Sequence, residues 1–393
     1  MGRHLPNIEK KSYRIWIHAV SVGEILSLQN LVNRIAGEHP DWDICVSVLT
    51  PSGMRIAQEK IKAASCLFFV PFDFKWIVRR FFLKVHPDIF VLTESELWPN
   101  LIRVASKKTH GVLVINGRMS ERAFRRHYRF RLVSRRILSN IFRFMMQTQK
   151  DAERLIRIGV DSRKVEVTGN LKCEVVLSRM DEEEKAQLKK ELSIPPDKVI
   201  IIAGSTRSGE EAILIEAFVE AKKTGNPMGL IVAPRHPERV EEIEKLSASY
   251  PVSVVRKTSY SGEKLWDILI LDTLGELTRF YDLSNAAFIG GSLVPWGGHN
   301  FLEPAFFGKP FFFGPHMDNF EHLAEIFIRE GAARIVRNRQ EVTSLFIQAS
   351  RGELVNMGRK AQTLLQSLQG ATEKTIKTME KMILSERNSR GHE

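Results

Sequence analysis

The sequence predicts an α/β protein made of two doubly wound domains, each a parallel sheet covered by helices. Short β-branched or aromatic runs alternate with helical patterns from residue 13 onward, which is the rhythm of repeated βαβ units. That rhythm breaks once, at a charged stretch over 180–198, and then restarts. A length of 393 residues fits two such domains better than one. We therefore expect domains over 1–180 and 181–393.

The first domain is predicted to contain seven strands separated by helical segments. Each expected strand is a short run rich in β-branched, aromatic or other apolar residues, as in a sheet buried on both faces. The expected strands are 13–20, 44–50, 65–71, 88–93, 111–116, 142–148 and 165–168. Because open parallel sheets bind ligands at the carboxyl ends of their strands, chemistry is expected at the strand-to-helix junctions.

The charged stretch over 180–198 reads as one amphipathic helix ending at Pro195-Pro196, and it marks the domain boundary. Six further strands follow, at 199–203, 228–233, 252–256, 267–271, 286–289 and 310–313. Residues from about 342 to 384 read as helical and polar, and we assign these C-terminal helices to the second domain. Two such domains are expected to face each other across a cleft.

The composition limits which kinds of partner the chain is expected to bind. A formal net charge of +12 indicates an anionic partner such as phosphate-bearing ligands, nucleic acid or a membrane surface. The three cysteines show no paired spacing, so they predict neither a disulfide framework nor a zinc site. No apolar run approaches the roughly 20 residues of a spanning helix, and the first dozen residues are polar. Membrane contact by this chain is therefore expected to be peripheral.

Three junctions in the first domain carry candidate catalytic residues. Gly23 and Glu24 follow the first strand, where a carboxylate in the first helical turn could act as a general base. Acids are common there for dipole reasons, and this segment alone favours that simpler explanation. Glu94 and Glu96 follow the fourth strand, where one acid could serve chemistry and the other orient a helix. Lys172 follows the last strand and could offset a phosphate or a carboxylate, although a lone lysine is more often solvated.

Four segments of the second domain indicate a nucleotide site. Residues 234–239 place Arg235 and His236 at a strand end, and 271–277 open a helix. Residues 290–300 are rich in glycine and precede a helix with Glu303 in its first turn. The fourth segment, 313–316, ends another strand. Each segment alone is explained by an ordinary turn, but four at strand ends favour a ligand. The absence of GxxxxGK[ST] disfavours a P-loop, and no GxGxxG follows the first strand of either half.

Two segments mix basic and aromatic residues at near-helical spacing, FKWIVRRFFLKVH over 74–86 and RAFRRHYRFRLVSRRILSNIFRF over 122–144. Packing of one apolar face explains part of this pattern. The remaining charge density suits an interface with anionic lipid.

These segments together resemble one family. HAVSVGE (18–24), LTESELWPN (92–100), VTGNLK (167–172), APRHPER (233–239), DTLGEL (272–277) and GGSLVPWGGHNFLEPA (290–305) are similar, in order and spacing, to the motifs of the 3-deoxy-D-manno-octulosonic acid (Kdo) transferases of lipopolysaccharide assembly. The likeness covers nearly the whole chain. Where the family usually has ETE, this chain has Glu94-Ser95-Glu96, which keeps both acids.

The resemblance implies an inverting, metal-independent glycosyltransferase of GT-B architecture that needs no cofactor. It implies CMP-Kdo as donor and a lipid A precursor as acceptor, with the acceptor in the first domain and the CMP-sugar in the second. It casts Glu24 as general base and assigns transition-state stabilisation to Glu94 and Lys172. The implied donor-binding residues are Pro234, Arg235, His236, Leu274, Gly275, Glu276, Asn300, Phe301, Leu302 and Glu303.

The resemblance also implies a peripheral place on the cytoplasmic face of the bacterial inner membrane, with no nucleic-acid partner. Family members typically carry an N-terminal hydrophobic anchor, whereas this chain begins with a short polar lead. Two alternatives remain open at this point. One is a GT-B transferase that uses a UDP-sugar, and the other is a basic protein that binds membrane or RNA without catalysis.

Overall fold

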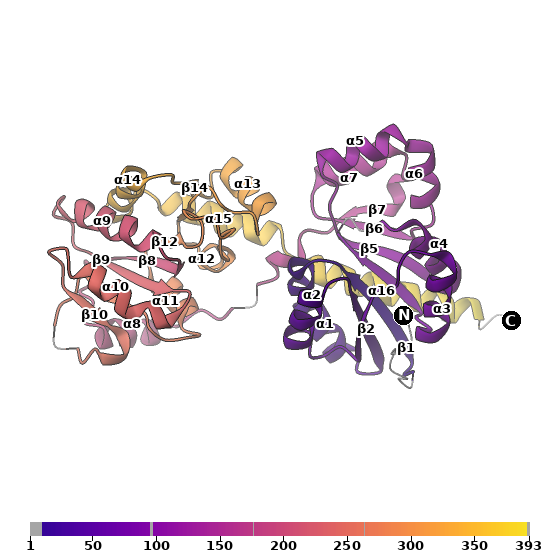
Figure 1. The fold of residues 1–393 in the computed structure, drawn as a ribbon, viewed down its shortest axis with the longest axis horizontal. Helices are drawn as coiled ribbons and strands as arrows, with labels where there is room; N and C mark the ends of the chain where they lie inside the picture. The colour runs from indigo at the N-terminus through magenta and orange to yellow at the C-terminus, as the bar shows by residue number, and fades with distance from the viewer. Residues whose placement is uncertain (1–9, 95–96, 176, 263, 391–393) are drawn as a thin grey trace. The chain divides into compact units, whose positions relative to one another are not determined.

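The structure is a computed structural model that describes residues 10–94, 97–175, 177–262 and 264–390, with side chains described as far as Ser385. Ser95 and Glu96, and most of the polar lead, lie outside the described residues. The chain divides into two compact units, and each is described by itself. Unit 1 comprises Met1–Glu174 and Leu368–Glu393, and unit 2 comprises Val175–Ser367 (Figure 1).

Unit 1 contains one seven-stranded sheet in which every described pairing is parallel, in the order β3-β2-β1-β4-β5-β6-β7. The strands are β1 (Tyr13–Ala19), β2 (Trp42–Val48), β3 (Cys66–Phe69), β4 (Ile89–Thr93), β5 (Gly111–Gly117), β6 (Arg143–Met146) and β7 (Val165–Val167). The direction of winding reverses between β1 and β4. Ligands of open α/β sheets bind at such a switch point, beyond the carboxyl ends of the strands.

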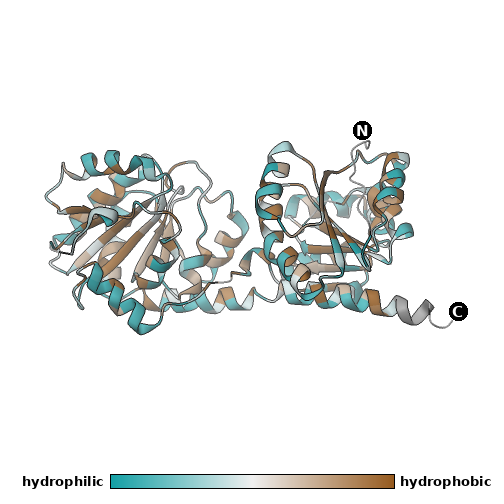
Figure 2. Ribbon diagram, turned by 90° about the horizontal axis from the view of Figure 1, so that it is seen from below, coloured by the Kyte–Doolittle hydropathy of each residue, from teal (hydrophilic) through white to brown (hydrophobic). Residues whose placement is uncertain are grey.

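Helices cover both faces of this sheet. Helices α1 (Val22–Glu38), α2 (Pro51–Lys60) and α16 (Ala371–Arg390) share one apolar core with the sheet. A second core on the other face takes in α3 (Lys75–Val85), α4 (Pro99–Lys108), α5 (Glu121–Arg129), α6 (Arg131–Leu138) and α7 (Gln149–Ile158). Figure 2 shows the strands coloured as apolar and the helices as amphipathic, which is the pattern that two-sided covering requires.

Unit 2 repeats this plan with the strand order β10-β11-β9-β8-β12-β13-β14, again parallel throughout its described pairings. Its strands are β8 (Val199–Thr206), β9 (Met228–Pro234), β10 (Val254–Arg256), β11 (Ile268–Ile270), β12 (Ala286–Ile289), β13 (Phe311–Phe313) and β14 (Arg334–Ile335). Its helices are α8 (Glu182–Glu191), α9 (Glu210–Lys222), α10 (Val240–Ser247), α11 (Leu277–Leu283), α12 (Leu302–Phe306), α13 (Glu321–Arg329), α14 (Arg339–Ser350) and α15 (Val355–Ser367). Short 3₁₀ turns lie at Ser162–Lys164, Leu171–Cys173, Pro237–Arg239 and Lys257–Ser259.

The predicted strands all form, within a few residues at their ends, and β14 is the one described strand that the prediction lacks. The charged stretch over 180–198 forms only the ten-residue helix α8, because Ser193 adopts a left-handed φ of 48° soon after it.

The division of the chain differs from the prediction at two places. Glu174 accepts hydrogen bonds from the backbone of Gly370 and Thr372, so unit 1 ends there rather than at residue 180. Met180 already belongs to unit 2, because its N–H donates to Asp282. The last helix, α16, was assigned to the second domain but packs on the first sheet, where Met379 is buried.

Candidate functional site

The carboxyl ends of β1 and β4 bring the first two predicted catalytic residues to the switch point of unit 1. Strands β1 and β4 are parallel neighbours, with His18 beside Leu92. Ser21 is the N-cap of α1, and its hydroxyl accepts from the Glu24 N–H. Glu94 follows β4 with a left-handed φ of 51°, and its N–H donates to Ile115 O. A left-handed glutamate is uncommon and strained, which fits a residue fixed for function.

Glu24 is buried, with only 5% of its surface exposed, and its carboxylate is held at both oxygens. Its Oε2 accepts from the Val20 N–H at 2.9 Å and from the Thr93 hydroxyl at 2.5 Å. Its Oε1 accepts from the Ser21 hydroxyl at 3.1 Å. This resembles a capping box displaced by one residue, because the acid reaches the N–H preceding the N-cap. The contacts fix the position of a carboxylate that a base needs.

Lys172 follows the edge strand β7, and its side chain reaches the same region of unit 1 as Glu24. A Cβ added to Gly23 would lie 3.5 Å from Lys172 Nζ, so the ammonium group is beside the first turn of α1. A polar network fixes its turn: Asn170 accepts from the Lys172 N–H and donates to Gln147, while Asn116 accepts from the Leu171 N–H. The structure thus brings Lys172 close to Glu24 within unit 1.

In unit 2, Pro234 ends β9 and is buried, whereas Arg235 and His236 beyond it are exposed. Leu274 is 77% exposed and Gly275 has a φ of 85°, which a glycine adopts without strain. Glu276 accepts from Lys257 at 2.7 and 2.8 Å and from the Thr273 hydroxyl. Burial acts to raise the pKa of Glu276, but these hydrogen bonds outweigh it and lower the pKa.

The segment over 300–303 divides between surface and core. Glu303 accepts from Asn300 Nδ2 at 3.2 Å and from the Thr278 hydroxyl at 2.7 Å, linking α12 to α11. Phe301 has no exposed surface and packs among phenylalanines, including Phe311 at 5.2 Å between ring centroids. Leu302 is also buried. The side chains of Phe301 and Leu302 therefore build the core that holds Asn300 and Glu303 in place.

The glycine-rich loop after β12 is organised by a buried acid that the sequence analysis did not identify. Glu210 has no exposed surface, and its carboxylate accepts from the backbone N–H groups of Gly291, Ser292, Leu293 and Arg207 at 2.7 to 2.9 Å. Glu210 therefore occupies these backbone donors and fixes the loop, much as a bound anion would.

Comparisons with known proteins indicate the family of this chain. The family described as 3-deoxy-D-manno-octulosonic-acid transferase (kdotransferase) matches residues 2–175. A 3-deoxy-D-manno-octulosonic acid transferase of Rickettsia conorii is 30% identical over 84% of this chain and 69% of its own length. This chain belongs to the Kdo transferase family.

A bifunctional glycosyltransferase/methyltransferase of Fusobacterium nucleatum is 34% identical over 87% of this chain, which spans only 53% of that relative. Among solved structures, a UDP-GlcNAc 2-epimerase from Neisseria meningitidis bound to UDP-GlcNAc aligns with a TM-score of 0.56 at 12% identity, over 94% of this chain and all of that one. The second likeness concerns the fold alone, and it agrees with the two Rossmann-like units of the GT-B class that the sequence predicted.

Two properties of the residues that the structure describes concern metal binding and membrane spanning. No group of three or more His, Cys, Asp or Glu side chains lies where it could hold a metal ion among these residues. No helix among them is both long and apolar enough to cross a bilayer.

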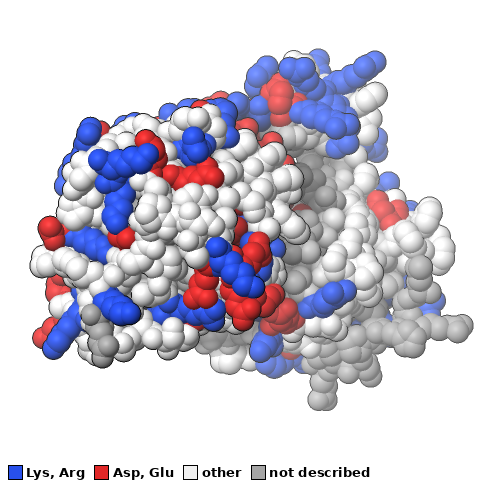
Figure 3. Space-filling model, turned by 60° about the vertical axis from the view of Figure 1, so that its left-hand side comes forward, with Lys and Arg blue, Asp and Glu red and all other residues white. Residues whose placement is uncertain are grey.

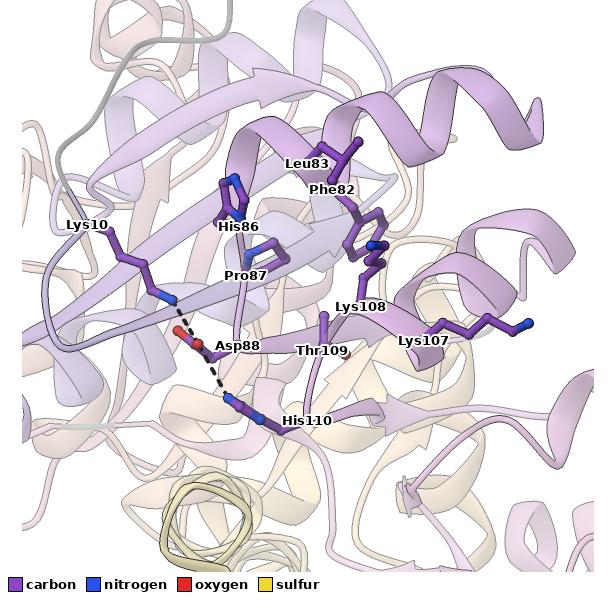
Figure 4. A pocket seen from close by; sticks show the side chains of 10 residues that line it. All are labelled: Lys10, Phe82, Leu83, His86, Pro87, Asp88, Lys107, Lys108, Thr109 and His110. Carbon is purple, nitrogen blue, oxygen red and sulfur yellow. Dashed lines mark hydrogen bonds and ion pairs between the residues drawn. The ribbon is translucent and has the colours of Figure 1, made fainter. Parts of the chain in front are cut away.

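A cavity of about 380 Å³ lies at the opposite, amino-terminal edge of the first sheet (Figure 4). Lys10 and His110 approach Asp88 from two sides there, at 2.8 and 3.3 Å, and Asp88 also accepts from the Arg14 N–H. These contacts tie the starts of neighbouring strands together. The cavity is separate from the candidate site, because it lies at the amino ends of the strands and ligands of open α/β sheets bind at the carboxyl ends.

Proposed function

We propose that this chain transfers Kdo from CMP-Kdo to a lipid A precursor with inversion at the anomeric carbon and without a metal ion. Membership of the family supports the reaction class. The observation that carries the proposal is the fixed carboxylate of Glu24 with the Lys172 ammonium beside it, at the switch point of unit 1. In unit 2, the cations at the carboxyl ends of β8 and β9, with Arg235 among them, support an anionic nucleotide donor.

The proposed reaction is a single displacement. Glu24 removes the proton from an acceptor hydroxyl, whose oxygen forms a bond to the anomeric carbon of Kdo. The bond from that carbon to the phosphate oxygen breaks, and its electron pair leaves with CMP. Arg235 stabilises the leaving phosphate, since a guanidinium matches phosphate geometry. Glu94 and Lys172 stabilise the transition state in this scheme.

The Glu24→Gln variant tests the role of the base. It keeps the size and most acceptor contacts of the side chain but cannot take a proton, so turnover should fall about 10²- to 10⁴-fold. CMP should still bind with wild-type affinity, because the donor contacts lie in unit 2. The assay resolves products of CMP-Kdo and lipid A precursor by mass. Glu38→Gln, an exposed acid at the end of the same helix, is the matched control. Wild-type turnover by Glu24→Gln would refute the assignment.

Nucleotide competition and chelation test the donor and the absence of a metal. CMP should inhibit the reaction strongly and UDP weakly, and EDTA should leave the rate unchanged. Strong inhibition by UDP alone would favour the UDP-sugar alternative, and loss of the rate in EDTA that Mg²⁺ restores would overturn metal independence.

We also propose that unit 1 meets the membrane through its basic–aromatic face, defined as the exposed surface of α5, α6 and Phe130 between them. Large apolar side chains project there, with Phe130 60%, Leu132 80% and Val133 61% exposed. Seven exposed arginines surround them: Arg122, Arg125, Arg126, Arg129, Arg131, Arg135 and Arg136. Figure 3 shows Lys and Arg gathered on the part of unit 1 where Figure 1 places these helices. Such a surface suits anionic lipid, and we place it on the cytoplasmic face of the inner membrane.

A further inference from the structure

Arg207 is the first residue beyond β8, and its guanidinium contacts two imidazoles and an indole ring. Its Nη1 donates to His236 Nε2 at 2.8 Å, and its Nε donates over a longer 3.4 Å to His299 Nε2. Its Cζ lies 4.5 Å from the centroid of the Trp296 ring, a cation–π distance. Neither Arg207 nor Arg235 forms a salt bridge with any residue that the structure describes.

The surrounding residues hold Arg207 in place without forming a salt bridge to its guanidinium. Glu210 binds the backbone N–H of Arg207, and its carboxylate is otherwise filled by the glycine-rich loop. His299 lies against Gly291, where a Cβ would come within 2.9 Å of the imidazole. Trp296, which is 59% exposed, forms a flat wall beside the guanidinium. The loop and the strand end therefore present a positioned cation at the ligand-binding edge of the sheet.

The cations at this edge repel one another in the absence of a ligand. Burial lowers the pKa of Arg207, and the nearby charge of Arg235 lowers it further. Burial also lowers the pKa of His299 to about 4, with added contributions from Arg207, Arg235 and His236. Crowded like charges cost stability unless an anion joins them, so this cluster is matched to an anionic ligand.

Arg207 and Arg235 follow neighbouring parallel strands at the same level. Thr206 and Pro234 are paired in register, and the Arg235 N–H donates to Thr206 O at 3.0 Å. Neighbouring strands lie about 4.8 Å apart, so the backbones of the two arginines lie next to each other at the edge of the sheet. A ligand with two anionic groups close together fits such a pair. In a CMP-activated 2-keto sugar acid, the anomeric carbon carries both the phosphate oxygen and the carboxylate.

We propose that Arg207 binds the carboxylate of the donor sugar while Arg235 binds the phosphate, so that Arg207 selects acidic over neutral sugar donors. The proposal rests on the proposed function. A guanidinium can accept a carboxylate at two N–H groups, and the Arg207 Nη2 has no hydrogen bond to any described residue. His236 supports Arg207 in turn: its Nδ1 lies 3.3 Å from Glu238, which leaves Nε2 to accept from the guanidinium.

The test compares two ligands that differ by the sugar acid. In the full chain, Arg207→Gln should weaken binding of CMP-Kdo about 10- to 100-fold, the range expected for losing a charged hydrogen-bonding partner. Its affinity for CMP should stay within about threefold of wild type. Arg207→Lys should restore part of the loss as a point charge. Arg235→Gln should weaken CMP and CMP-Kdo together. Arg337→Gln, which removes one exposed charge elsewhere in unit 2, is the charge-matched control.

Two results for CMP and CMP-Kdo would overturn the assignment. One is equal weakening of CMP and CMP-Kdo by Arg207→Gln in a variant that retains the circular dichroism and melting temperature of wild type. The other is unchanged affinity for both ligands. A parallel titration with CDP tests whether Arg207 binds a second phosphate instead of the sugar carboxylate. If Arg207→Gln weakens the binding of CDP but leaves the binding of CMP-Kdo intact, Arg207 is a ligand of a second phosphate and the proposal is refuted. Wild-type protein that neither binds nor turns over CMP-Kdo would instead refute the proposed function itself.

Discussion

His18 is a buried histidine at the end of β1, and it predicts a pH dependence of stability in unit 1. Its Nδ1 lies 3.0 Å from Ser47 Oγ, while its Nε2 has no hydrogen-bond partner among the residues that the structure describes. Burial lowers the pKa of His18 to about 4, although the backbone of Ser47 acts to raise it. The unfolded chain, with a histidine pKa of about 6.5, therefore binds the proton first as the pH falls.

We expect His18 to cost unit 1 about 3 kcal/mol of stability as the pH falls from 6.5 to 4, because protonation favours the unfolded state. Hydrogen exchange of the β1 amides across this pH range measures the effect. The His18→Gln variant carries no titrating group there, so its dependence on pH should be shallower. An identical slope in both proteins would contradict the cause.

Replacing the buried acid Glu210 should lower the stability of unit 2 strongly. Replacing it with alanine leaves four backbone N–H groups without their acceptor, so Glu210→Ala should destabilise unit 2 by on the order of 3 kcal/mol or more. Chemical unfolding followed by hydrogen exchange in β8 and β12 measures this. Glu183→Ala, at an exposed position on α8, should change stability by less than about 0.5 kcal/mol. A small effect at Glu210 would mean that water replaces the carboxylate.

The positions of the candidate site residues differ in how far the sequence could predict them. Glu24, Glu94 and Arg235 could be placed at strand ends because each follows an apolar run that reads as a strand. Glu210 could not be found that way, because an acid in the first turn of a helix is ordinary and only the fold shows which loop it binds. Asn116 gave a weak signal, an Asn-Gly pair at a strand end, and its role in holding the turn of Lys172 appears only in three dimensions.

At the scale of elements, α5 and α6 give a prediction about lipid binding. Phe130→Ser and Leu132→Ser together should weaken binding to vesicles rich in phosphatidylglycerol about tenfold or more, because each side chain would otherwise bury apolar surface. Higher salt should weaken binding as well. Co-sedimentation with vesicles measures both effects.

Leu265→Ser is the matched control, since Leu265 is an exposed leucine of unit 2, with 70% exposure. A loss of vesicle binding in this variant equal to that of the double variant would show that the basic–aromatic face has no special role.

Strands were predictable as elements because both faces of each sheet are covered, so buried strands such as β8 read as continuous apolar runs. The packing partner of α16 was not predictable in the same way. Its helical period identifies an amphipathic helix, but Ile376, Met379 and Ile383 would suit the face of either sheet. Only the return of the chain after Ser367 decides between them.

At the scale of the whole molecule, α16 predicts that a change at the C-terminal end acts on unit 1. Met379→Ala should cost unit 1 about 2–5 kcal/mol, because it opens a cavity between α16 and the first sheet. Hydrogen exchange should accelerate in β1 and β5 and stay unchanged in β8 and β9. Lys381→Ala, one exposed position on the same helix, should leave both units unaffected. Faster exchange in unit 2 would contradict the division of the chain.

The insertion of unit 2 within unit 1 also sets the order in which a ribosome can deliver the parts. Strands β1 to β7 emerge first, but the helix that completes one side of their sheet emerges only after all of unit 2 has been made. At about 10 residues per second, that interval is roughly 20 s. During it, unit 2 can finish folding while the nascent first sheet keeps an uncovered apolar strip, which makes this stage of synthesis the one at which chaperones and proteases would compete for the chain.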